Sequence, residues 1–135
     1  MKAIVVKKYG PPDALDLKIV AKLAPRHDEV LIKVHASSMN SWNWEFLNGT
    51  PFINRFMFGL LKPQVGKQKL GADIAGTVEA VGSQVTCFQP GGEVFGDLWD
   101  NWGGFTELEP KPVTSSFDQA AAIPQAGVLA LLGLM

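Results

Sequence analysis

Side chains that could bind a metal or act as a nucleophile are few in this chain. A catalytic zinc ion needs three nitrogen, sulfur or carboxylate ligands and one open position. His27 falls in a turn and His35 on a strand, and neither has a second histidine or a cysteine close by in the sequence. Cys87 is the only cysteine, which excludes an internal disulfide. We therefore predict packed or solvated histidines, a small core cysteine and no metal site.

Glycine-rich phosphate-binding motifs are also missing from the sequence. A dinucleotide-binding turn has the spacing GxGxxG before a helix N-terminus, whose backbone amides hold the pyrophosphate. That spacing occurs nowhere in the 135 residues. Gly66-Lys67 lacks the earlier glycine and the following Ser or Thr of a phosphate loop. The sequence as given therefore assigns no residue to cofactor binding.

Aromatic residues gather in two windows. The first holds Trp42, Trp44, Phe46, Phe52, Phe56 and Phe58, and the second holds Phe95, Trp99, Trp102 and Phe105. Aromatic-lined clefts suit flat apolar ligands. Core packing is the alternative, and we favour it for Phe46, Phe95 and Phe105. Trp99 lies in a polar, glycine-containing stretch typical of an exposed loop, where ligand contacts are common.

The elements expected to position these residues are mostly short strands. Alternating or β-branched runs between Gly and Pro turns predict strands at 2–7, 15–19, 29–37, 74–81, 93–95 and 105–108. Repeated glycines from Gly71 to Gly96 indicate tight corners in a small curved sheet. Residues 41–47 predict a short helix, with Asn40 or Ser41 as N-cap and Gly49 as a left-handed C-terminal residue. Residues 51–62 predict a loop with one or two helical turns.

The C-terminal segment predicts an interaction helix. Ser116 and Gln119 have the spacing of a capping box, and Pro124 is expected to kink the helix that follows. Residues 120–135 carry no charge but are too short and too interrupted for a membrane span. Nothing later in the sequence is left to cover their leucines. We therefore expect a homo-oligomer through residues 120–135, most simply a two-fold dimer.

Composition and charge exclude several classes of protein. The chain is 47% hydrophobic and 19% charged, which is too apolar for a disordered segment. A net charge of −1 gives no reason to expect nucleic acid as a partner. No apolar stretch of signal-peptide type follows Lys2, so the cytoplasm is the expected compartment, with no membrane association.

Four stretches resemble the medium-chain dehydrogenase/reductase family in its GroES-like catalytic domain. They are GADIAGTVEAVGSQVTCFQPGGEVFG at 71–96, YGPPDALDL at 9–17 with DEVLIKVHASSMN at 28–40, and FDQAAAIPQAG at 117–127. The resemblance implies a mainly β fold, a GroES-like partly open barrel with a few short helices and a C-terminal interface helix. It divides the chain into a substrate domain at 1–116 and an interface helix at 117–135. We expect a chain truncated before the nucleotide-binding domain.

The same resemblance bears on zinc. Zinc-bearing members have a cysteine where this chain has Asn40, and the histidine of a GHE motif where it has Ala72. Neither an amide nor a methyl group replaces those ligands. The pattern is similar to the zinc-free, quinone-reductase-like branch of these alcohol-dehydrogenase-like proteins. In that branch NADPH transfers a hydride to a quinoid or conjugated carbonyl, and the protein positions and polarises the substrate.

Carried onto this sequence, the family motif makes Asn40 the catalytic candidate, beside the nicotinamide and the substrate. Asn43, Trp44, Asp73 and Trp99 are the candidates for the substrate cleft. The alternative for Asn40 is a helix N-cap, and both roles can hold together. Asn43 replaces the usual aspartate, so we favour a structural role for it. Asp73 is expected to accept hydrogen bonds from backbone amides in the cleft floor.

Two departures from the family weaken the case for catalysis by this chain. Leu129 stands where a threonine usually bonds toward the nicotinamide, and Gly92 stands where an aspartate usually follows Gly91. The leading hypothesis is the substrate-domain portion of a zinc-free, NADPH-dependent oxidoreductase, inactive alone, that takes a small apolar or quinoid ligand. The alternative is a stand-alone ligand-binding or oligomeric interaction module derived from that domain. A gene remnant is a third reading.

Overall fold

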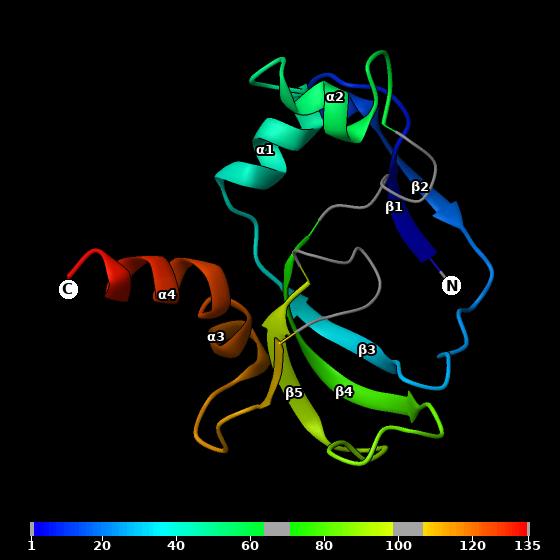
Figure 1. The fold of residues 1–135 in the computed structure, drawn as a ribbon, viewed down its shortest axis with the longest axis vertical. Coiled ribbons are helices and arrows are strands. Elements are labelled where there is room, and N and C mark those ends of the chain that lie inside the picture. Colours follow the sequence, from blue (N-terminus) through cyan, green and yellow to red (C-terminus); the bar gives the residue numbers. More distant parts are fainter. Residues whose placement is uncertain (1, 64–70, 99–106, 135) are drawn as a thin grey trace. The chain divides into compact units, whose positions relative to one another are not determined.

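The structure is a computed structural model that describes residues 2–63, 71–98 and 107–134. They belong to two compact units, one formed by residues 1–22 and 39–70 and the other by residues 23–38 and 71–135. We name the first the hairpin unit and the second the sheet unit, and Figure 1 colours both along the sequence.

The hairpin unit combines two strands with short helices. Strand β1 (Lys2–Val6) pairs antiparallel with β2 (Leu15–Ile19), and the 3-10 helix η1 (Pro12–Ala14) joins them. Helices α1 (Ser41–Asn48) and α2 (Asn54–Phe58) follow. The core of this unit holds the buried side chains of Val6, Ala14, Phe46 and Leu47. Both predicted strands, the helix at 41–47 and the helical turn within 51–62 are confirmed.

Arg55 fixes the end of α1. Its Nε donates to the carbonyl oxygen of Gly49 at 2.9 Å, and its Nη2 donates to that of Asn48 at 3.1 Å. The guanidinium lies 4.6 Å from the centroid of the Tyr9 ring, and the Tyr9 hydroxyl donates to the carbonyl of Gly59 at 2.7 Å. Burial raises the pKa of Tyr9, while the charge of Arg55 acts to lower it. Gly49 has a φ of 66°, the left-handed C-cap that the sequence predicted.

The sheet unit is an antiparallel sheet of four strands in sequence order. They are β3 (Val30–Ser37), β4 (Asp73–Val81), β5 (Glu93–Asp97) and β6 (Glu107–Pro110). Ile74, Ala75, Val78 and Val94 are buried in it. Two register shifts interrupt the pairing of β3 with β4. The described residues are therefore sheet-dominated with a few short helices, as the sequence predicted.

Two of the predicted glycine positions are needed for close backbone approach. A Cβ added at Gly76 would overlap the carbonyl oxygen of Lys33 on the neighbouring strand. One added at Gly82 would overlap the carbonyl oxygen of Arg26, beside the turn that precedes β3. Glycine is therefore required at these points because another segment of backbone occupies the space of a side chain.

The capping box predicted at Ser116 is present. The Ser116 hydroxyl accepts from the backbone amide of Gln119 at 3.2 Å, and the Gln119 side chain accepts from the amide of Ser116 at 3.0 Å. Helix α3 (Phe117–Ala121) starts there and packs its small residues Ala120 and Ala121 against Ala75 of β4. The close fit depends on these short side chains, which let the helix approach the strand.

Pro124 ends one helix and starts another, so the prediction of a single kinked helix is wrong. Helix α3 ends at Ala121, and α4 (Pro124–Leu132) begins with Pro124 in its first turn. A proline in the first turn loses no intrahelical hydrogen bond, because the amide there has no partner within the helix. Two separate helices are therefore less costly than one helix with proline in its interior.

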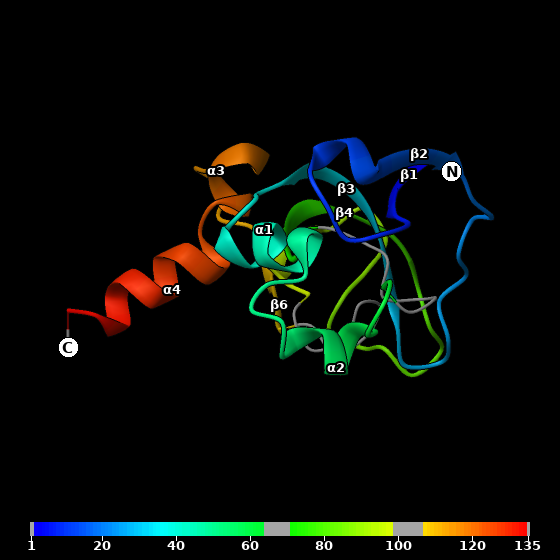
Figure 2. The ribbon, with the colours of Figure 1, turned by 90° about the horizontal axis from the view of Figure 1, so that it is seen from above.

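Helix α4 has no buried residue. Figures 1 and 2 both show it extending from α3 away from the sheet, with the C-terminus at its free end. The exposed fractions are 53% for Val128, 60% for Leu129, 61% for Leu131 and 60% for Leu132. Across the described ranges, no helix combines the length and the apolar character needed to cross a bilayer.

Two further predictions need correction. Cys87 is exposed rather than buried, because it lies in the turns that connect β4 to β5 and not on a strand. The strand predicted at 105–108 is observed as β6 at Glu107–Pro110, and residues 105 and 106 lie outside the described ranges.

Candidate functional site

The start of helix α1 positions the catalytic candidate. Asn40 is the N-cap, in extended backbone with φ −128°. Its backbone amide donates to Oδ1 of Asn43 at 3.1 Å, and the amide of Asn43 donates to the carbonyl of Asn40 at 3.1 Å. Asn43 is only 4% exposed. The N-cap position of Asn40 and a structural role for Asn43 are thus both observed, while catalysis by Asn40 stays a prediction.

The first aromatic window divides into the buried Phe46 with its half-buried partner Phe58 and an exposed group. Phe46 is 5% exposed and meets Phe58 edge to face, with ring centroids 5.1 Å apart. Trp44, by contrast, is 54% exposed, Phe52 60% and Phe56 70%. The hairpin unit therefore presents aromatic rings to solvent near α1 and α2, where a flat ligand can stack.

Asp73 anchors the end of β3 inside the sheet unit. It is fully buried at the first position of β4. Its Oδ2 accepts from the Ser38 hydroxyl at 2.9 Å, and its carbonyl oxygen accepts from the Ser37 hydroxyl at 2.9 Å and the Ser38 amide at 3.2 Å. The sequence predicted backbone amides as partners of this carboxyl group, whereas in the structure the Ser38 hydroxyl donates to it.

The predicted site residues fall in both units. Asn40, Asn43 and Trp44 belong to the hairpin unit, where Asn40 and Asn43 are in contact. Asp73 belongs to the sheet unit, and Trp99 lies outside the described residues. Their assignment to one substrate cleft stays a prediction. The sequence does not predict the role of Ser38, because no local pattern links it to a strand that begins 35 residues later.

The two histidines are engaged in packing or lie in solvent. Nε2 of His35 lies 3.1 Å from the Thr77 hydroxyl, and the ring stacks on Phe117 at a centroid distance of 4.4 Å. His27 lies in an exposed turn, 3.9 Å from Asp28. Within the part of the chain that the structure describes, no three His, Cys, Asp or Glu side chains cluster as metal ligands do.

Comparison with known proteins identifies the class. Residues 26–130 match the alcohol dehydrogenase GroES-like domain. The chain belongs to this family and is a quinone-reductase-like member of the medium-chain dehydrogenases/reductases. The quinone oxidoreductase of Sus scrofa is 38% identical over an alignment that covers 100% of this chain and 41% of the relative.

Solved structures agree with this assignment. The quinone oxidoreductase from Coxiella burnetii has a TM-score of 0.83 and 33% identity, over 99% of this chain and 44% of its own. The Escherichia coli quinone oxidoreductase complexed with NADPH has a TM-score of 0.79 over 99% of this chain and 40% of its own, and at 21% identity it supports the fold alone. The chain thus spans less than half the length of these proteins.

Proposed function

We propose that this chain is the substrate-domain part of a zinc-free, NADPH-dependent oxidoreductase acting on quinones or conjugated carbonyls in the cytoplasm. The observation that carries the proposal is the similarity to quinone oxidoreductases over the whole chain. Two residues support its zinc-free part. Asn40 and Ala72 stand where the family resemblance places zinc ligands, and neither side chain can replace a thiolate or an imidazole.

The described residues fit the substrate side of such a reaction. Bound NADPH would supply the hydride. Asn40 is held at the α1 N-terminus by the two backbone hydrogen bonds that it makes with Asn43. An amide side chain there can donate to a carbonyl oxygen as negative charge develops. The exposed rings of Trp44, Phe52 and Phe56 can stack on a planar ligand.

The residues of this chain do not fit the cofactor. A pyrophosphate cradle needs a strand, a GxGxxG turn and a helix N-terminus in succession, and the sequence has no GxGxxG. Leu129, at the position where the family resemblance implies a threonine, is 60% exposed on α4 and offers no polar side-chain atom. We therefore propose that residues outside this sequence hold NADPH and that the chain alone is inactive.

The test is to join the chain to the nucleotide-binding portion of a related quinone oxidoreductase. The chain alone is expected to bind NADPH more weakly than about 10 μM, a free energy of roughly −7 kcal/mol, in calorimetric titration. The fusion is expected to oxidise NADPH with a simple quinone, and Asn40→Ala to lower kcat by about 10²–10³. A fusion that binds NADPH and is folded, yet reduces no quinone, would overturn the proposal, and tight NADPH binding by the chain alone would contradict its cofactor part.

Zinc content gives an independent prediction. Protein purified without a metal-binding tag is expected to contain much less than one equivalent of zinc by elemental analysis. The physical reason is that an amide and a methyl group replace thiolate and imidazole at Asn40 and Ala72. Near-stoichiometric zinc that survives mild chelation would show that other residues form a site.

The exposed helix α4 favours a second candidate function, an oligomeric interaction module derived from this domain. The coding sequence downstream of codon 135 separates the two. An in-frame strand, GxGxxG turn and helix would support the enzyme, and a stop codon would support the module.

A further inference from the structure

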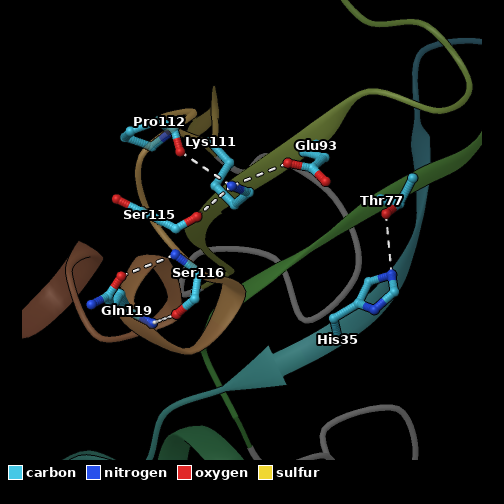
Figure 3. A network of polar contacts seen from close by, with 8 residues as sticks. All are labelled: His35, Thr77, Glu93, Lys111, Pro112, Ser115, Ser116 and Gln119. Carbon is cyan, nitrogen blue, oxygen red and sulfur yellow. Dashed lines mark hydrogen bonds and ion pairs between the residues drawn. The ribbon is translucent and has the colours of Figure 1, made fainter.

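Lys111 is a buried lysine at the junction between β6 and α3. Its side chain is 5% exposed. Its ammonium lies 3.1 Å from Oε2 of Glu93 on β5 and donates to the carbonyl oxygens of Pro112 at 3.1 Å and Ser115 at 2.6 Å (Figure 3). An ammonium has three donors, and lysine is rarely buried without partners. These three contacts tie the connection before α3 to the sheet.

Phe117, the first residue of α3, is contacted by the Lys111 ammonium and by a side chain of β3. The ammonium of Lys111 lies 5.3 Å from the centroid of the Phe117 ring. The imidazole of His35 stacks on that ring, with centroids 4.4 Å apart and planes inclined by 11°. His35 is in turn oriented by the Thr77 hydroxyl of β4, as Figure 3 shows. Phe117 is therefore contacted by a cation and by a stacked ring, both supported by the sheet.

We propose that Lys111 and His35 form a clamp on Phe117 that sets how α3 lies on the sheet and thereby the direction in which α4 extends from it. Further along α3, Ala120 and Ala121 pack against Ala75, with Ala36 and Phe95 against the same cluster, and Phe117 is the large apolar side chain that α3 contributes to this contact. The clamp thereby positions α4, whose apolar residues are exposed. This role concerns residues outside the candidate site and does not depend on the proposed reaction.

The test uses nuclear magnetic resonance of the whole chain. It has two histidines, so the ring protons of His35 can be compared with those of the exposed His27. Stacking on Phe117 is expected to move the His35 ring protons upfield in the wild-type chain. Lys111→Met is expected to abolish that shift and to accelerate amide exchange in α3 and α4 by about tenfold or more. Amides of β4 are expected to keep their protection.

The controls separate positioning from general stability. Lys111→Arg keeps the cation and is expected to retain the His35 shift, while Phe117→Leu is expected to remove it. Lys33→Met removes an exposed lysine from β3 and is expected to change neither readout. An unchanged His35 shift and unchanged α3 exchange in Lys111→Met would overturn the clamp. Loss of β4 protection in that variant would overturn it as well, because Lys111 would then act on the whole sheet.

Discussion

The chain at about 100 μM is expected to be a homodimer, and Leu131→Glu is expected to weaken its association by about a hundredfold or more. Leu131 and Leu132 are each at least 60% exposed on α4, and burying a leucine stabilises by about 1.5–3 kcal/mol. A two-fold interface contains each residue twice, so a single glutamate removes two such contributions and places two charges near each other.

A second copy of the chain is the occupant that the sequence of this helix favours. Residues 120–135 carry no charge, so two copies can meet along α4 without like-charge repulsion. Val128 and Leu132 lie one turn apart and can form an apolar stripe with Leu131. Such a stripe is self-complementary, as a two-fold contact requires.

Light scattering and sedimentation over a concentration series measure this association. Leu61→Glu is the matched control, because Leu61 is 87% exposed in the hairpin unit and lies outside α4. It is expected to leave the dimer intact, whereas Leu132→Glu should act like Leu131→Glu. A wild-type chain that stays monomeric at about 100 μM, with α4 helical by amide exchange, would contradict the proposed oligomer.

The sequence predicted those elements whose signals are local. Strand β2 was predicted at its observed bounds because alternation and the Gly-Pro-Pro turn lie within a few residues of it. Helix α1 was predicted from Asn40 or Ser41 as its N-cap and Gly49 as its C-cap, since capping depends on neighbours three or four positions away. The family resemblance then supplied the topology, which no local signal contains.

What the sequence did not predict depends on contacts between distant residues. Cys87 has an apolar neighbour in Phe88, but its exposure follows from the path of the chain between β4 and β5. The hydrogen bond between Ser38 and Asp73 joins the residue after β3 to the first residue of β4. The contact of Lys111 with Glu93 forms only once β5 and β6 are paired. Burial of a polar group is a tertiary property, so periodicity cannot locate it.

Asp73→Ala is expected to lower the free energy of unfolding by about 2–4 kcal/mol. The carboxyl group is fully buried and accepts from the Ser38 hydroxyl at 2.9 Å. Its removal leaves a cavity and a donor whose partner is lost, and both effects destabilise the end of β3. Asp73→Asn keeps the size and an acceptor oxygen, so it is expected to retain more of the stability. Urea unfolding, followed by circular dichroism, measures these differences.

A double-mutant cycle with Ser38→Ala assigns the effect to this hydrogen bond. Ser38→Ala alone is expected to cost about 1 kcal/mol, and the two substitutions together less than the sum of the separate effects. Additive effects would show that Asp73 does not act through Ser38. In the fusion with a nucleotide-binding portion, Asp73→Asn is expected to change kcat little, because the observed role is to hold the end of β3. A loss of kcat of about a hundredfold without loss of stability would instead make Asp73 a participant in the reaction.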